Sequence, residues 1–179
     1  MVPDNSTTPR ALLITGTVGV GKTSVAEAAG NLLADAEIPH AVMDLDWLCN
    51  SWPRPAGDPF NFGMVLRNLR LVAGSYLDAG VSRLVLAGVA ESRAERRQYE
   101  EALGIGLSVC RLRVQLPTVH RRLAHRHGDD HTGLTWHLNR SGELDRILDR
   151  AEVEDFGIDA TDTSVAATAT AVLQRADWL

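Results

Sequence analysis

Short apolar runs alternate with longer stretches of helical periodicity along most of the chain. The apolar runs predict five β-strands, at residues 11–15, 41–44, 83–88, 108–114 and 156–159. Apolar residues spaced three or four apart predict helices over 22–35, 62–79, 93–103, 118–126, 134–150 and 164–177. Strands that alternate with helices in this way are typical of a parallel sheet with crossover helices. The pattern therefore predicts an α/β fold with a parallel sheet between helical layers.

Length and composition are those of one compact domain. The chain has 179 residues, of which 45% are hydrophobic and 23% charged. We expect a flexible N-terminal leader over residues 1–10 and a single domain over 11–179. The formal net charge of -5 argues against nucleic acid as the main partner. No apolar stretch approaches the ~20 residues that span a bilayer, and the polar start lacks the regions of a signal peptide. A cytoplasmic location is expected.

A glycine-rich motif follows the first predicted strand. Residues 16–23 match every fixed position of the phosphate-binding pattern G-x-x-x-x-G-K-[ST], between a strand and a helix. In such a loop the backbone N–H groups surround phosphate oxygens, Lys22 reaches the β- and γ-phosphates, and the Thr23 hydroxyl binds Mg²⁺. The alternative is a glycine-rich turn after a buried strand. The nucleotide-binding residues predicted here are Gly16, Thr17, Val18, Gly19, Val20, Gly21, Lys22, Thr23 and Ser24.

Two carboxylates follow the second predicted strand. Asp44 and Asp46 stand two positions apart, so on an extended strand both side chains would point toward the phosphate pocket. One carboxylate could accept the proton of a substrate hydroxyl, and the other could hold Mg²⁺ through water. We favour Asp46 as the base because it lies farther beyond the strand. The alternative is that Asp46 caps a short helix starting at Trp47.

The third predicted strand ends without the Asp that many phosphate-loop proteins carry there. No N-K-x-D guanine motif occurs either, and both absences argue against a motor or a GTPase. Glu91 and Arg93 follow this strand, at the edge where open α/β sheets bind ligands. They are candidates to contact the phosphoryl acceptor. Alternatively, Glu91 is a first-turn residue favoured by the helix dipole.

Arginine and histidine are concentrated after the fourth predicted strand. Arg122 and Arg126 are four residues apart, so on a helix they share a face and could clamp a polyphosphate or stack on a base. The alternative is a solvated face with intramolecular ion pairs. The histidines at 120, 125, 127 and 131 fit a mobile polar lid or a zinc site, although no cysteine accompanies them.

Together these motifs resemble the small P-loop kinases, which include shikimate and gluconate kinases, adenylylsulfate kinase and chloramphenicol phosphotransferase. The resemblance rests on the phosphate loop, D-x-D at 44–46, R-R-L-x-x-R at 121–126 and the Ile-Asp-Ala-Thr-Asp stretch at 158–162. It implies a five-stranded parallel sheet of order 2-3-1-4-5, Mg-ATP as phosphoryl donor, and an arginine-bearing lid at about 118–140. Asp162 and Thr163 would then flank the adenine. The catalytic roles fall on Lys22, Asp44, Asp46, Arg122 and Arg126, with Thr23 and Asp44 at the metal.

The activity expected from the motifs and the resemblance is ATP-dependent phosphoryl transfer to a hydroxyl of a small molecule. The acceptor pocket is expected between residues 47 and 70, where aromatic rings could stack on a ring and arginines could pair with an anion. Its predicted residues are Asp46, Trp52, Phe62, Arg67 and Arg93. A nucleotide, a sugar acid and an antibiotic are all left open as acceptors.

Two other classes of function use the same loop. A P-loop ATPase or nucleotide-dependent switch would need no small-molecule acceptor, and a degenerate module would only bind Mg-ATP. The paired carboxylates and the arginines favour the kinase, because a binding module needs no base. A homodimer is left open.

Overall fold

The computed structural model describes residues 8–128 and 130–179. Residues 1–7 of the expected leader, and residue 129 of the expected lid, lie outside the described residues. The first strand begins at Arg10, so the last residue of the expected leader belongs to the sheet. In chain order the elements are β1 (Arg10–Thr15), α1 (Lys22–Asp35), β2 (His40–Asp44), α2 (Leu45–Leu48), α3 (Phe62–Asp78), β3 (Arg83–Ala87), α4 (Arg93–Leu103), β4 (Gly106–Arg113), α5 (Leu116–His127), α6 (His131–Ala151), β5 (Phe156–Asp159) and α7 (Val165–Arg175).

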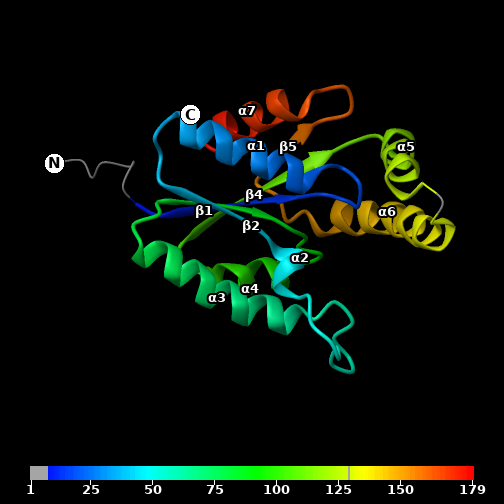
Figure 1. Ribbon diagram of the computed structural model, residues 1–179, viewed down its shortest axis with the longest axis horizontal. Coiled ribbons are helices and arrows are strands. Elements are labelled where there is room, and N and C mark those ends of the chain that lie inside the picture. Colours follow the sequence, from blue (N-terminus) through cyan, green and yellow to red (C-terminus); the bar gives the residue numbers. More distant parts are fainter. Residues whose placement is uncertain (1–7, 129) are drawn as a thin grey trace.

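The five strands form one parallel sheet in the order β2-β3-β1-β4-β5, which confirms the predicted fold and strand order. Helices α1 and α7 cover one face of the sheet, and α3 and α4 cover the other (Figure 1). Helices α5 and α6 lie together at one end of the molecule (Figure 1). Because all strands run the same way, the loops that follow β1, β2 and β3 emerge at one edge of the sheet.

The central strand β1 is buried on both faces. Leu12 and Ile14 belong to the core beneath α1 and α7, and Ala11 and Leu13 belong to the core beneath α3 and α4. This alternation explains why β1 has no polar side chain between Arg10 and Thr15, as expected for a strand covered by helices on both sides. Two apolar layers therefore hold the strand that delivers the chain into the phosphate loop.

A buried arginine ties α6 to the sheet. Arg111 in β4 is 1% exposed and forms ion pairs with Asp145 and Asp149 of α6, at 2.9 and 2.8 Å. Its guanidinium also lies 3.6 Å from Glu154, which precedes β5. A buried charge needs such partners, because its water shell is lost. These contacts fix the C-terminal half of the helix whose N-terminal half reaches the candidate site.

Arg111→Ala is expected to destabilise the protein by about 3 kcal/mol, because it removes the buried cation that joins three carboxylates and leaves Asp145 without an ion-pair partner among the described residues. Urea unfolding followed by circular dichroism measures this change. Arg113→Ala is the matched control, since Arg113 pairs with Asp149 and Glu154 but is half exposed. We expect it to cost less than about 1 kcal/mol. Equal losses from the two variants would contradict a special role for the buried guanidinium.

Candidate functional site

The loop after β1 adopts backbone conformations that need glycine. Gly19 has a φ of 83°, and a Cβ placed there would lie 2.9 Å from Leu123 of α5. A Cβ at Gly16 would lie 2.7 Å from the Leu112 carbonyl oxygen. Contacts this short leave no room for a side chain, so the loop packs directly against β4 and α5. Gly16, Thr17 and Val20 are buried behind the loop, while Val18, Gly19, Gly21, Lys22, Thr23 and Ser24 line the cavity in front of it.

Lys22 is the first residue of α1 and points across the loop. Its Nζ donates to the carbonyl oxygens of Gly16 and Thr17, both at 3.1 Å. Burial lowers the pKa of its ammonium, and the nearby carboxylates of Asp46 and Asp44 oppose that shift. Lys22 is also the only lysine of the whole sequence, where the other 17 of 18 basic Lys and Arg residues are arginines. The one flexible, compact ammonium of the chain therefore stands at the position where the motif requires it.

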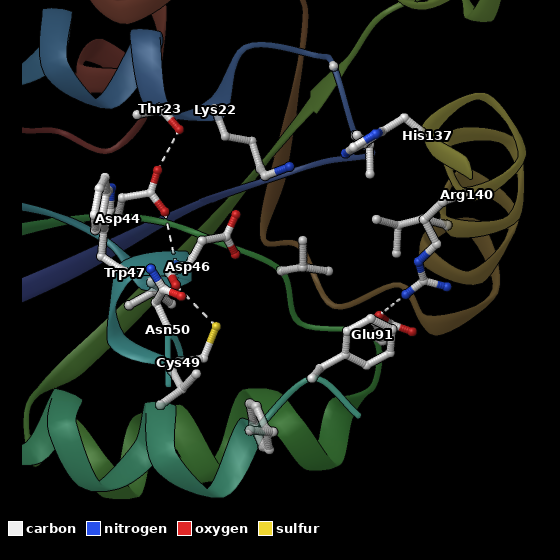
Figure 2. Close-up of a pocket in the computed structure, with 18 of the residues that line it drawn as sticks. Lys22, Thr23, Asp44, Asp46, Trp47, Cys49, Asn50, Glu91, His137 and Arg140 are labelled. Atoms are coloured by element: carbon white, nitrogen blue, oxygen red, sulfur yellow. Dashed lines mark hydrogen bonds and ion pairs between the residues drawn. The ribbon is translucent and has the colours of Figure 1, made fainter. Parts of the chain in front are cut away.

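Thr23 and Asp44 meet at the start of α1. The Thr23 hydroxyl donates to Asp44 Oδ2 at 2.6 Å, although the two residues lie 21 positions apart (Figure 2). A hydroxyl and a carboxylate are the hard oxygen ligands that Mg²⁺ prefers, so this pair fits the metal that phosphate-loop proteins use. The predicted pairing of Thr23 with Asp44 is thus brought together by the fold.

The expected geometry of Asp44 and Asp46 is corrected by the structure. Strand β2 ends at Asp44, whose Oδ1 accepts a hydrogen bond from the Asp46 backbone N–H at 2.9 Å. This bond starts the short helix α2 at Leu45, so Asp46 lies on a helix and not on an extended strand. The cap is Asp44, and the prediction that Asp46 caps a helix from Trp47 is wrong. Asp46 nevertheless projects toward the side of the cavity that Lys22 faces (Figure 2).

The cavity in front of the phosphate loop has a volume of about 990 Å³. That is large enough to enclose a small organic ligand together with part of a nucleotide. It lies between the loop, α2, the segment before α3, the start of α4, and helices α5 and α6. The residues that line it include Lys22, Thr23, Asp44, Asp46, Trp47, Cys49, Asn50, Arg54, Asp58, Phe60, Phe62, Glu91, Glu95, Tyr99, Arg122, Arg126, Trp136, His137 and Arg140.

Both predicted arginines of α5 belong to this cavity. Arg122 donates to the carbonyl oxygens of Val20 and Ala160, at 3.2 and 3.3 Å, and so joins the phosphate loop to the segment after β5. Arg126 lies one helical turn further and lines the same cavity. With Lys22 they place positive charge on the loop side of the cavity, where phosphate groups would lie.

Glu91 and Arg140 form the opposite wall. They are joined by an ion pair between the end of β3 and α6 (Figure 2). Glu91 precedes the helix cap, which is Ser92, and the acidic first-turn residue of α4 is Glu95. Glu95 Oε2 accepts a hydrogen bond from the Glu91 N–H at 2.7 Å. Of the two alternatives for Glu91, the structure therefore places it at the cavity and not in the first turn of a helix.

Three predicted acceptor residues do not line the cavity. Trp52 is 92% exposed, and Arg67 lies on the exposed face of α3. Arg93 pairs with Glu152 at 3.7 Å and lines a separate shallow pocket on the other side of Glu91. Asp162 and Thr163 are exposed and also lie outside the cavity lining. Of the five residues predicted to form the acceptor pocket, Asp46 and Phe62 line the cavity.

The expected lid at about 118–140 includes the first half of α6, but sequence reasoning did not name its cavity residues. Trp136 and Arg140 are one helical turn apart, so they share a face, and His137 lies beside them. That spacing was readable from the sequence, but nothing local indicated which face of a long polar helix turns toward the phosphate loop. The deciding contact is distant, since the buried Thr17 hydroxyl donates to the Ser141 carbonyl oxygen at 2.5 Å.

The histidines of α5 and α6 make separate contacts. His120 bonds the Ser141 hydroxyl at 3.2 Å, and the rings of His127 and His137 pack at a tilt of 41° with their centres 4.6 Å apart. Among the described residues, no group of three or more His, Cys, Asp or Glu side chains is arranged to hold a metal ion.

Within residues 8–128 and 130–179, none of the helices has the length and apolar character needed to cross a membrane.

Comparison with solved structures finds the same fold in several enzymes. A gluconokinase from Sinorhizobium meliloti 1021 superposes with a TM-score of 0.61 at 22% identity, over 94% of this chain and 93% of that chain. The APS kinase of Mycobacterium tuberculosis, in complex with AMPPNP and APS, gives a TM-score of 0.61 at 22% identity, over 95% and 98%. A tunicamycin resistance protein from Deinococcus radiodurans gives 0.67 at 18% identity, over 96% and 97%.

No family model matches the sequence, and a search of curated proteins finds no match. The structural likeness spans nearly the whole chain in each case. The chain therefore has the fold of the small P-loop kinases, as the sequence motifs indicated.

Proposed function

We propose that this protein is a small-molecule kinase that transfers the γ-phosphoryl group of Mg-ATP to a hydroxyl of its acceptor. The observation that carries the proposal is the shared cavity, in which the ammonium of Lys22 and the carboxylate of Asp46 face the same space. A protein that only binds nucleotide has no use for a carboxylate without partners at this place. Two structural neighbours, a gluconokinase and an APS kinase, support the same class of reaction.

The loop side of the cavity would bind and orient the triphosphate. Its backbone N–H groups and the positive end of α1 suit phosphate oxygens, and Lys22 would leave the carbonyl oxygens of the loop to reach the β- and γ-phosphates. Arg122 and Arg126 would neutralise the charge that develops as the phosphoryl group moves. Thr23 and Asp44 would hold Mg²⁺, which offsets phosphate charge when bound.

Asp46 would orient the acceptor hydroxyl and accept its proton. Its carboxylate has no hydrogen bond or ion pair with any of the described side chains, so it is free to bind a ligand. A carboxylate in this position raises the nucleophilicity of a hydroxyl only when the two are within hydrogen-bond reach. Holding donor and acceptor in line within one cavity would lower the barrier further, because their relative orientation would be fixed before reaction.

Transfer of label from γ-³²P-ATP to pooled acceptors tests the proposal. Nucleosides, sugars, sugar acids, amino alcohols and phenicol and aminoglycoside antibiotics form the pools. Label that appears in one pool only, and only with intact Lys22, supports the kinase. Release of free phosphate at the same rate in every pool would indicate an ATPase or a switch instead.

Asp44→Asn is expected to raise the Mg²⁺ concentration for half-maximal rate by about ten-fold, because an amide is a weaker partner for Thr23 and for the metal. Asn caps helices as well as Asp does, so α2 keeps its start and the fold is retained. A magnesium titration of the transfer rate measures the effect. An unchanged titration would mean that Asp44 acts only as the cap of α2.

A further inference from the structure

The two sides of the cavity carry different charges. Lys22, Arg122 and Arg126 lie on the phosphate-loop side. The other side of the cavity, from Asp46 to Arg140, is called here the acceptor side, and its lining contains more carboxylates than guanidinium groups. The carboxylates are Asp46, Asp58, Glu91 and Glu95, and the guanidinium groups are Arg54 and Arg140.

The cations on the acceptor side are already engaged. Arg140 pairs with Glu91 and with Glu143, at 2.9 Å for the second pair, and its side chain is 11% exposed. Arg54 donates to the Pro59 carbonyl oxygen at 3.0 Å within its own loop. An anionic acceptor at Arg140 would therefore have to compete with two carboxylates that already pair with it, whereas the carboxylate of Asp46 is open to a donor.

Three large, exposed aromatic rings line the same cavity. Trp47 on α2, Phe60 before α3 and Trp136 on α6 all line it, and they are 76%, 51% and 54% exposed. Each ring comes from a different element of the lining, and Trp47 lies beside Asp44 (Figure 2). Large apolar side chains that stay exposed around one cavity are typical of a binding surface. Their faces attract apolar groups and cations and do not attract anions.

We infer that the acceptor is a neutral or cationic alcohol with an aromatic or otherwise apolar ring, and not a sugar acid, phosphate ester or sulfate. This inference rests on the proposed function, because it names the substrate class of the same site. The ring would lie against Phe60 or Trp136, and the hydroxyl would lie at Asp46. The excess of carboxylates over free cations would reject an anionic analogue of the same shape.

Three small alcohols that share a phenyl ring and a benzylic hydroxyl test the inference. Phenylethanolamine is cationic, phenylethylene glycol is neutral and mandelate is anionic. Their binding is measured by saturation-transfer NMR titration in the presence of Mg-AMPPNP. We expect the amine and the glycol to bind at least about five-fold more tightly than mandelate.

Matched variants locate the binding. Phe60→Ala and Trp136→Ala are expected to weaken binding of the amine and the glycol by about five-fold. Tyr76→Ala, on the exposed face of α3 and outside the cavity, is the control and should leave binding unchanged. Mandelate binding as tight as the amine, an equal effect of all three variants, or no binding by any alcohol would overturn the inference.

Failure of the proposed function would look different. Nucleotide binding is read separately, from protection of Lys22 against an amine-selective acylating reagent by Mg-AMPPNP. Absence of protection would reject the kinase proposal whatever the alcohols do. Protection together with a preference for mandelate would leave the kinase in place and reject only the acceptor class.

Discussion

Lys22→Ala is expected to lower phosphoryl transfer by at least about 10²-fold, the usual cost of removing one donor that stabilises charge in the transition state. In this chain no second lysine can take over, because Lys22 is the only one. The guanidinium groups of Arg122 and Arg126 come from α5 and would be too bulky and too differently placed to replace an ammonium at the start of α1. Initial rates of label transfer in the responsive acceptor pool measure the loss.

The loss should come without unfolding. Lys22 donates only to two carbonyl oxygens of its own loop, so its removal should cost about 1 kcal/mol or less. Thermal unfolding of the variant is the control, together with Lys22→Arg, which keeps the charge and changes the shape of the donor. A Lys22→Ala protein that is folded and transfers phosphoryl within a few-fold of the unmodified rate would refute the proposed mechanism.

The single lysine offers a measurement that needs no acceptor. An amine-selective reagent can modify only Lys22 and the N-terminal amine, and the lowered pKa of Lys22 favours its reaction. Peptide mapping then reports the state of one side chain directly.

The phosphate-binding half of the site could be predicted because its determinants are local. The motif, its glycines and Lys22 lie within eight consecutive residues, and Lys22 contacts only that loop. The strand order was predicted from the resemblance to the small P-loop kinases, and the approximate bounds of the helices were predicted from the spacing of apolar residues. A local error was made at Asp44, where the strand was assumed to continue. A side-chain cap ended it instead, and that cap turned Asp46 from a strand residue into a helix residue.

The pairing of Glu91 with Arg140 could not be predicted, because it joins segments that are distant in the sequence. Glu91 and Arg140 are 49 residues apart. Their pairing requires α6 to lie across the edge of the sheet where the loops after β1, β2 and β3 emerge. That crossing is fixed by Arg111 and Thr17, whose partners also lie on α6. The segment before α3 misled for a similar reason. The Asn61 side chain donates to the Cys49 carbonyl oxygen, and the Asp58 carboxylate accepts hydrogen bonds from the first two N–H groups of α3. With the segment held in this way, Phe60 reaches the cavity and Trp52 does not.

Asp46→Asn is expected to lower the transfer rate by on the order of 10²-fold or more, because an amide cannot accept the proton of the acceptor hydroxyl. Asp46 is exposed on α2 and its side chain supports no other described residue, so stability should change by less than about 0.5 kcal/mol. The affinity for Mg-ATP should stay the same or rise, since a negative charge near the phosphates is removed. Steady-state rates at saturating ATP, with nucleotide affinity measured separately by calorimetry, distinguish these effects.

A second readout separates the role of a base from a structural role. The carboxylate of Asp46 helps to keep the pKa of Lys22 from falling further, so its loss should lower that pKa. More Lys22 is then unprotonated at a given pH, and the amine reagent should modify it faster in Asp46→Asn than in the unmodified protein. Arg93→Gln, at a site outside the cavity, should change neither the rate of phosphoryl transfer nor the rate at which Lys22 is modified. Weakened nucleotide binding with an unchanged turnover at saturation would assign Asp46 to the nucleotide or metal, and the base would have to be sought elsewhere in the cavity.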